Sequence, residues 1–231
     1  MLALSNVNQY YGQSHTLWDI NLTAEKGQCL CIMGRNGVGK TTLLKVIMGL
    51  LKPQSGNILL NGRDFTRRAT PDRARHGIAY VPQGRLIFPQ LTVEENLIVS
   101  LSARRDKRKR IPEHIFQLFP VLKEMQQRRG GDLSGGQQQQ LAIGRALCLD
   151  PSFLILDEPT EGIQPNIVHE IGDIILKLNK ELQLSVLLVE QKLSFARRVA
   201  SDFCIMEKGQ FVAKGPIGQL DEQLIKRHLA V

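Results

Sequence analysis

A glycine-rich run at residues 34–42 has the residue types and spacing of a phosphate-binding loop. A glycine, four residues and then Gly-Lys-Thr make up the P-loop pattern. Its glycines let successive backbone N–H groups turn inward around a polyphosphate, and a helix expected to begin at Lys40 adds the positive end of its dipole. In this pattern Lys40 meets the β and γ phosphates, and Thr41 offers its hydroxyl to Mg²⁺. The expected phosphate-binding residues are Gly34, Arg35, Asn36, Gly37, Val38, Gly39, Lys40, Thr41 and Thr42.

Two adjacent carboxylates, Asp157 and Glu158, follow the apolar run 153–156. An apolar strand that ends in acids is the Walker B arrangement, which complements a P-loop. Because side chains alternate on a strand, the two acids point different ways and can take different roles. We expect Asp157 to hold the Mg²⁺ ligand shell and Glu158 to polarise the water that attacks the γ phosphate.

The elements that must position these residues follow from the hydrophobic pattern. Alternating apolar residues up to Leu22 predict half-buried antiparallel strands, and the continuous apolar run 29–33 predicts a buried strand that leads into the P-loop. Later buried strands alternate with helices, which implies a parallel sheet covered on both faces. Thr92 and Glu95 form a capping box for a helix to about Leu101, and 111–119 has further helical spacing.

The predicted fold class is therefore α/β. It has a P-loop NTPase core with a mostly parallel sheet, an N-terminal antiparallel β subdomain and an inserted α-helical subdomain at approximately 84–150. We expect residues 1–231 to form a single nucleotide-binding domain, since 231 residues with 42% hydrophobic content can bury a substantial core.

Composition excludes several other classes of protein. The chain has no leader-like segment and no uninterrupted apolar run long enough to span a membrane, so we expect neither secretion nor a membrane-spanning segment. The cysteines are scattered, which favours buried thiols in a reducing cytosol over a zinc site or disulfides. They are Cys29, Cys31, Cys148 and Cys204.

The chain is basic, with 30 Lys and Arg against 22 Asp and Glu, a formal net charge of +8. Seven consecutive positions, 104–110, are basic except for Asp106 and resemble a nucleic-acid or lipid patch. Without interleaved aromatic residues, a solvated loop between helices is the favoured interpretation, and we expect no nucleic-acid partner.

The run Leu133-Ser134-Gly135-Gly136-Gln137 predicts a second anion site. Ser134 caps a helix, while Gly135 and Gly136 leave its first N–H groups exposed. With this run the chain resembles the ABC ATPase family over essentially its whole length, and the motifs occur in the order found in that family. The resemblance implies the ABC ATPase fold, ATP as the nucleotide, Tyr11 as the residue that stacks on adenine, and Gln83 as a further Mg²⁺ ligand.

One chain has one P-loop and one run of the Leu133 type. In the family that it resembles, these two motifs engage the same nucleotide only across a head-to-tail dimer. The resemblance therefore implies a second ABC ATPase subunit, with ATP held between Lys40 of one subunit and Ser134 of the other. Gln83, which joins the core to the helical insert, is placed to relay hydrolysis to that insert.

Gln191 stands where the family usually has a histidine. Glutamine can hydrogen-bond phosphate but cannot become a cation. Since similar amino-acid and urea importer ATPases commonly carry this glutamine, we expect Gln191 to act beside Glu158 as a competent catalytic residue. A nucleotide-dependent binding module with little turnover is the alternative.

Three runs, 81–85, 91–97 and 158–165, closely resemble the branched-chain amino acid and urea transporter group. Gln83 within Pro-Gln-Gly-Arg favours urea or short-chain amides as the transported solute, and a branched-chain amino acid importer is the alternative. A soluble ABC ATPase without a transport role is a third alternative, although such proteins usually have tandem nucleotide domains or a long coiled coil. The importer resemblance implies an identical or different partner ATPase, two transmembrane permease subunits and an external solute-binding protein. It also implies a peripheral position on the cytoplasmic face of the bacterial inner membrane.

Overall fold

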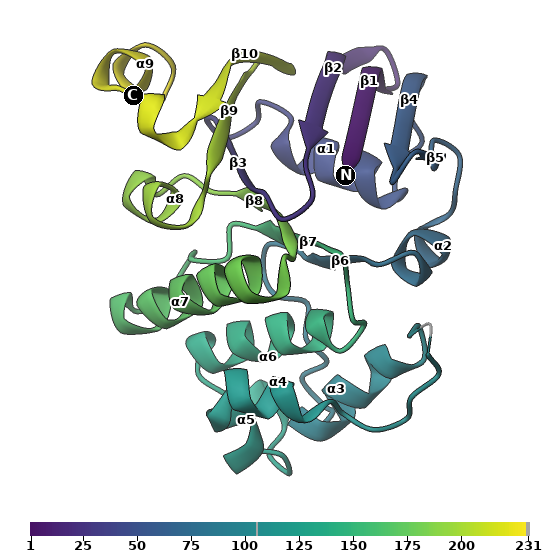
Figure 1. Cartoon of the computed structure of the whole chain (residues 1–231), viewed down its shortest axis with the longest axis vertical. Helices are drawn as coiled ribbons and strands as arrows, with labels where there is room; N and C mark the ends of the chain where they lie inside the picture. Colours follow the sequence, from purple (N-terminus) through teal and green to yellow (C-terminus); the bar gives the residue numbers. More distant parts are fainter. Residues whose placement is uncertain (105, 230–231) are drawn as a thin grey trace.

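The computed structural model describes residues 1–104 and 106–229. Figure 1 shows the N-terminal strands and the C-terminal hairpin at one end of the molecule, and helices at the other. Arg105, part of the basic run, lies outside the described residues.

An antiparallel sheet with the strand order β2-β1-β4-β5 contains the N-terminal strands, as predicted. Its strands are β1 Leu2–Tyr11, β2 Ser14–Ala24, β4 Ser55–Leu60 and β5 Arg63–Asp64. Alternate residues of β1 and β2 face inward, and one hydrophobic cluster joins them to the helix that follows the P-loop. The antiparallel sheet therefore packs against the helix that follows the P-loop and supports the loop through it.

The second sheet has the order β10-β9-β3-β8-β7-β6, and its β3, β6, β7, β8 and β9 are paired in parallel. Every residue of β3, β7 and β8 is buried, as continuous apolar runs predict. The bounds are β3 Cys29–Met33, β6 Ile78–Val81, β7 Phe153–Asp157, β8 Ser185–Val189, β9 Asp202–Glu207 and β10 Gln210–Pro216. The carboxyl ends of parallel strands meet at one edge of a sheet, which is where ligands bind in such folds. The segments that follow β3, β6, β7 and β8 therefore lie close together.

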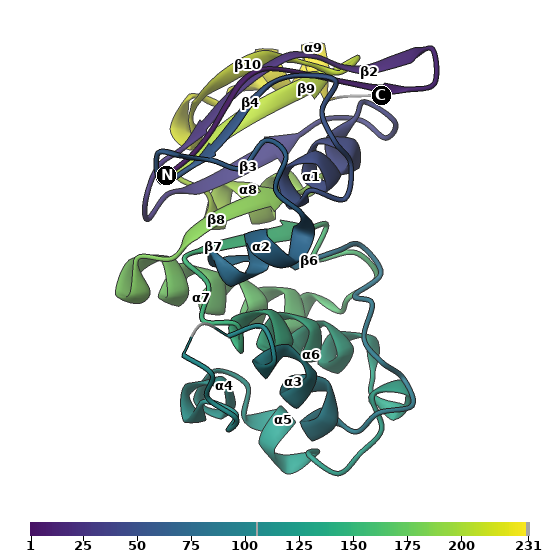
Figure 2. The same ribbon diagram turned by 90° about the vertical axis from the view of Figure 1, so that its right-hand side faces the viewer.

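Helices cover the parallel sheet and extend from it. The helices near the sheet are α1 Lys40–Met48, α2 Thr70–Arg75, α7 Pro165–Leu182, α8 Leu193–Val199 and α9 Glu222–His228. Those between β6 and β7 are α3 Val93–Leu101, α4 Glu113–Leu118, α5 Pro120–Glu124 and α6 Gly135–Leu147. Short 3₁₀ turns span Gly130–Asp132 and Ile217–Gln219. Figures 1 and 2 agree that α3–α6 gather at the end away from the antiparallel sheet.

Helix boundaries follow the predicted signals, with one difference. The capping box is confirmed: the Glu95 N–H donates to Thr92 Oγ1 at 3.1 Å, and the Thr92 N–H donates to Glu95 Oε2 at 2.7 Å. The helical spacing predicted over 111–119 is realised only as α4, because Pro112 delays the start and Pro120 begins a separate helix, α5.

Two observations bear on the predictions made from composition, one on membrane-spanning helices and one on the cysteines. The described part of the chain contains no helix that is both long and apolar enough to cross a bilayer. All four cysteines are buried free thiols, and burial raises the pKa of Cys29 to about 12. Such thiols are unreactive at neutral pH.

Arg73 is buried, at 1% exposure, and caps the carboxyl end of the helix that follows the P-loop. Its Nη1 donates to the carbonyls of Val46 at 3.0 Å and Ile47 at 2.6 Å, and its Nη2 donates to the Phe65 carbonyl at 2.6 Å. Burial lowers its pKa to about 10, so the guanidinium still carries its charge at neutral pH. It supplies the donor for the Ile47 carbonyl and adds a second donor to the Val46 carbonyl, which also accepts from the Gly49 N–H at 3.1 Å.

Replacing Arg73 with methionine is expected to lower the free energy of unfolding by about 2 to 3 kcal/mol, because the buried Ile47 carbonyl loses its donor. Guanidinium denaturation measures this change. Arg75→Met is the matched control, since Arg75 is exposed and its pair with Asp72 at 3.5 Å is worth little. Equal stability of the two variants would contradict the capping role of Arg73.

Candidate active site

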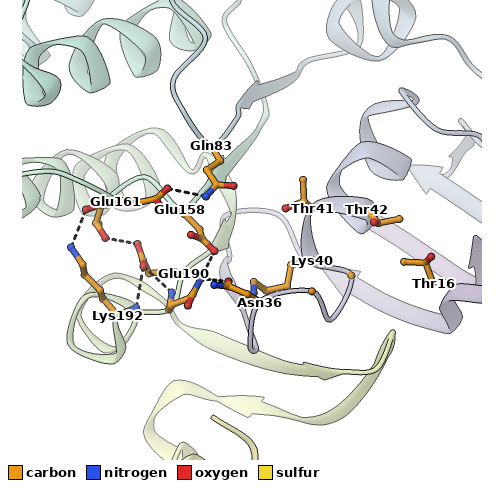
Figure 3. Close-up of a pocket in the computed structure, with 14 residues that line it drawn as sticks. Thr16, Asn36, Lys40, Thr41, Thr42, Gln83, Glu158, Glu161, Glu190 and Lys192 are labelled. Atoms are coloured by element: carbon orange, nitrogen blue, oxygen red, sulfur yellow. Dashed lines mark hydrogen bonds between the residues drawn. The ribbon is translucent and has the colours of Figure 1, made fainter. Parts of the chain in front are cut away.

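A cavity of about 590 Å³ lies at the carboxyl edge of the parallel sheet, and Figure 3 shows its lining. The sequence-predicted residues that line it are Asn36, Gly37, Gly39, Lys40, Thr41, Thr42, Gln83, Glu158 and Gln191. Sequence reasoning missed Thr16, Thr160, Glu161, Glu190 and Lys192, which also line it. The P-loop, the Walker B acid and Gln191 therefore meet at one place, although they are far apart in the chain.

The P-loop is shaped by glycines that other residues could not replace. Gly34 has φ +153°, and a Cβ there would lie 2.4 Å from the Met206 carbonyl oxygen. Gly39 has φ +109° and immediately precedes α1, which begins at Lys40 as predicted. Together they let the loop turn tightly and direct the amino end of α1 at the cavity.

The ammonium group of Lys40 is held inside the loop. It donates to the carbonyl oxygens of Gly34 at 2.7 Å and Arg35 at 2.8 Å. Burial lowers its pKa, and the nearby carboxylates of Glu158 and Asp157 oppose that shift. A desolvated cation in this position is suited to bind phosphate oxygens.

Glu158 stands at the cavity wall with its backbone in the left-handed region, at φ +49°. Its Oε1 accepts a 2.6 Å hydrogen bond from Gln191 Nε2, which also donates to Asn36 Oδ1 at 2.8 Å. Gln191 thus connects the P-loop to the Walker B glutamate. Residues held in rarely populated backbone conformations cluster at active sites.

Replacing Gln191 with alanine is expected to reduce turnover about tenfold, because a charge-assisted hydrogen bond that fixes Glu158 is lost. ATP affinity should change little. Steady-state hydrolysis and equilibrium ATP binding separate the two effects. Gln191→His, which keeps a donor at this position, is the control, and a wild-type rate for Gln191→Ala would contradict the role of this bond.

Asp157 lies behind the cavity wall rather than in its lining, with 2% of its surface exposed. The hydroxyl of Tyr80, on the neighbouring strand β6, donates to Asp157 Oδ2 at 3.2 Å. Burial raises the pKa of Asp157 to about 6, while the Tyr80 hydrogen bond and Lys40 oppose the shift. Sequence reasoning missed Tyr80, because its contact with Asp157 depends on the register of β6 against β7.

Of the three expected Mg²⁺ ligands, two line the cavity and one does not. Thr41 and Gln83 line the cavity, and Asp157 lies behind it. A hydroxyl, an amide oxygen and a carboxylate are the oxygen donors that Mg²⁺ prefers together with nucleotide phosphates, so the residues fit the ion. No cluster of three or more His, Cys, Asp or Glu side chains able to hold a metal occurs among the described residues.

The run 133–137 faces a different cavity. Ser134 caps α6 as predicted, since its Oγ accepts from the Gln137 N–H at 3.3 Å and its own N–H donates to Gln137 Oε1 at 2.9 Å. Ser134, Gly135, Gly136 and Gln137 line a second groove of about 700 Å³, beside α5 and α7, while Leu133 is buried. Within the chain, the structure does not bring this run to the P-loop.

Tyr11 is also apart from the cavity. It ends β1, is 47% exposed and is absent from the cavity lining. Its stacking on adenine stays a prediction.

Comparison with known proteins decides the family. The model of the family described as ABC transporter matches residues 17–161. The chain belongs to the ABC transporter family. It is 39% identical over 92% of its length to the high-affinity branched-chain amino acid transport ATP-binding protein BraG of Pseudomonas aeruginosa, and covers 91% of that protein. It is 37% identical over 96% of its length to the probable branched-chain amino acid transport ATP-binding protein LivF of Archaeoglobus fulgidus, and covers 94% of that protein.

The fold prediction is confirmed by solved ABC cassettes. One is a dimeric post-hydrolysis state of the ATP-binding cassette MJ0796 bound to ADP and Pi, with a TM-score of 0.83 and 27% identity over 94% of this chain and 99% of that one. The ATPase prediction is likewise confirmed, because an ABC transporter ATPase hydrolyses ATP to drive transport. This ABC ATPase therefore contains an antiparallel sheet, a mostly parallel sheet and covering helices in the cassette arrangement.

The basic run of this ABC ATPase is partly structural. Arg104 is 7% exposed, pairs with Asp106 at 2.7 Å and donates to the Cys148 carbonyl at 2.9 Å. Residues 107–110 are exposed in the segment between α3 and α4, as expected for a solvated loop. The expected absence of a nucleic-acid partner stays a prediction.

Proposed function

We propose that this chain is the ATP-hydrolysing subunit of an importer for branched-chain amino acids, with residues 1–231 as a single nucleotide-binding domain. The ATPase part is supported by the one cavity that unites Lys40, Glu158 and Gln191. The solute class is supported by two relatives whose names specify branched-chain amino acid transport. These names favour the amino-acid alternative over the urea preference drawn from Gln83.

In this proposal the P-loop binds the triphosphate of ATP. Lys40 exchanges its bonds with the loop carbonyls for β and γ phosphate oxygens, and Tyr11 stacks on the adenine. Thr41, Gln83 and Asp157 would hold Mg²⁺, which supplies positive charge against the phosphates when bound. Their oxygen donors are the support for that assignment.

Glu158 acts on the attacking water. Its carboxylate accepts a proton from the water as the water oxygen bonds to the γ phosphorus, which makes the water a better nucleophile. The bond from the γ phosphorus to the β–γ bridging oxygen breaks, so that ADP leaves and inorganic phosphate forms. Gln191 holds Glu158 in place through the 2.6 Å hydrogen bond. Because Gln191 also donates to Asn36, it fixes the position of Glu158 relative to the P-loop.

The site is completed by a second ABC ATPase subunit, identical or different. The run 133–137 of one subunit meets the nucleotide bound by the P-loop of the other. This is supported by the separation of the two motifs into different cavities of one chain and by the dimeric state of the similar cassette. Two permease subunits and an external solute-binding protein complete the importer, on the cytoplasmic face of the bacterial inner membrane.

Reconstitution tests the proposal. The chain, the permeases and the solute-binding protein encoded by neighbouring genes are placed in proteoliposomes, and ATP hydrolysis is measured with the binding protein loaded with leucine, isoleucine, valine or urea. Stimulation by the branched-chain amino acids is expected. Stimulation by urea alone would contradict the solute assignment, and co-sedimentation with ribosomes or DNA instead of the permeases would contradict the transport role.

A further inference from the structure

We propose that Glu161 is a positioning residue, which orients the side-chain amide of Gln83 so that its oxygen faces the Mg²⁺ site. The inference rests on the proposed role of Mg²⁺. It concerns an acid that follows the Walker B glutamate by three positions and has no role in the chemistry described above.

The contact that carries the inference is a hydrogen bond between two wall residues. Gln83 Nε2 donates to Glu161 Oε2 at 2.9 Å. An ionised carboxylate can only accept, so the end of the amide that faces Glu161 must be its nitrogen. In Figure 3 the Gln83 nitrogen lies on the side of Glu161, and its oxygen points the opposite way, toward Thr41. The one amide atom able to bind a cation is thereby directed at Thr41, another of the expected ligands.

Two hydrogen bonds hold the backbone of Glu161 in place. Its N–H donates to the Glu158 carbonyl at 3.2 Å, which closes a turn directly after β7. Arg85 Nη2 donates to the Glu161 carbonyl at 3.4 Å. The described residues include no salt-bridge partner for the Glu161 carboxylate. The carboxylate is therefore presented to Gln83 from a fixed backbone, without a competing cation.

Without Glu161 the amide could turn over and present N–H groups to a cation. A glutamine amide reverses with a simple rotation of its terminal bond, and the wrong orientation cannot bind a metal. Because Glu161 orients the Gln83 amide before Mg²⁺ and ATP bind, binding is not opposed by the free energy of ordering that amide.

Two substitutions separate positioning from charge. Glu161→Ala removes the acceptor and leaves the backbone contacts with Glu158 and Arg85. Glu161→Gln removes the negative charge but keeps a carbonyl oxygen that can accept from Gln83 Nε2. Glu181→Ala, at an exposed position near the end of α7, controls for loss of a surface acid.

The measurement is the ATP affinity of the isolated chain with Mg²⁺ and with EDTA, at protein concentrations where it is monomeric. The ratio of the affinity in Mg²⁺ to the affinity in EDTA measures how much the ion tightens ATP binding. We expect Glu161→Ala to reduce this ratio about tenfold, the value of one charge-assisted hydrogen bond, and to leave the EDTA affinity unchanged. Glu161→Gln should give a ratio between those of Glu161→Ala and the wild type, because its own amide can accept from Gln83 Nε2 but can also donate to the Gln83 oxygen. Glu181→Ala should keep the wild-type ratio.

A second readout needs neither nucleotide nor turnover. The side-chain amide protons of Gln83, assigned by NMR with Gln83→Ala, should shift in Glu161→Ala in the absence of metal. In the Gln83→Ala background, Glu161→Ala should reduce the ratio no further, because both act through one amide.

The outcomes are distinguishable. A wild-type ratio for Glu161→Ala overturns the inference, and so does a Glu161→Gln ratio as low as that of Glu161→Ala, since charge would then be the cause. If Mg²⁺ does not tighten ATP binding even in the wild type, the proposed metal role fails together with the inference.

Discussion

Replacing Glu158 with glutamine is expected to reduce ATP turnover by at least about 100-fold, because an amide cannot accept the proton of the attacking water. The glutamine is isosteric, and its carbonyl oxygen can still accept the hydrogen bond from Gln191. ATP should therefore bind normally and remain unhydrolysed. The variant should accumulate as an ATP-bound dimer, which gel filtration with ATP and Mg²⁺ detects.

Phosphate release is the direct measurement for this variant. Glu181→Gln, at an exposed position of α7, is the matched control and should hydrolyse ATP like the wild type. Release of phosphate by Glu158→Gln at the wild-type rate would show that another group is the base.

Replacing Asp157 with asparagine is expected to have opposite effects on stability and activity. The pKa of Asp157 is raised to about 6 by burial, against an ordinary value of 3.8. The folded state thus binds this proton more tightly than the unfolded chain does. The stabilisation from proton binding is complete below pH 4 and is lost as pH rises through 6. At neutral pH the buried carboxylate costs about 3 kcal/mol, which asparagine avoids.

Denaturation in EDTA across pH 4 to 8 checks this expectation. Asp157→Asn should be more stable than wild type at pH 8, and the difference should shrink as pH falls. Its hydrolysis of ATP with Mg²⁺ should fall by at least about 100-fold, because a neutral amide replaces the expected metal carboxylate. A difference that is independent of pH, or a less stable variant at pH 8, would contradict the burial argument.

The parts of the site that sequence predicted are those set by local pattern. The strand before the P-loop, α1 at Lys40, the cap at Ser134 and the acids at the end of β7 each depend on a few consecutive residues. Their meeting at one sheet edge then follows from parallel pairing, which the alternation of strands and helices implied.

The parts that sequence missed depend on contacts between distant side chains. Tyr80 reaches Asp157 only because β6 pairs with β7 in one register. Glu161 reaches Gln83 across 78 positions of the chain. Arg73, on the short helix α2, is buried against the carbonyls of α1, which lies far from it in the sequence. No local spacing encodes such contacts. The solute is less predictable still, because in the proposed importer it never touches this subunit.

In the proposed dimer, each ATP site has two walls, with Lys40 on the wall from one chain and Ser134 on the wall from its partner. The two residues line different cavities of the same chain. A Ser134→Glu substitution places a negative charge where the γ phosphate of the partner's ATP would meet α6.

The most direct test is the rate of ATP hydrolysis by the assembled transporter that carries Ser134→Glu, with ATP binding to the isolated variant chain measured alongside. Unchanged binding is expected, together with a hydrolysis rate that falls to background if both ATPase subunits are this chain, or to at most about half if they differ. A wild-type rate would contradict the shared site, because the nucleotide would then be hydrolysed without the Ser134 wall.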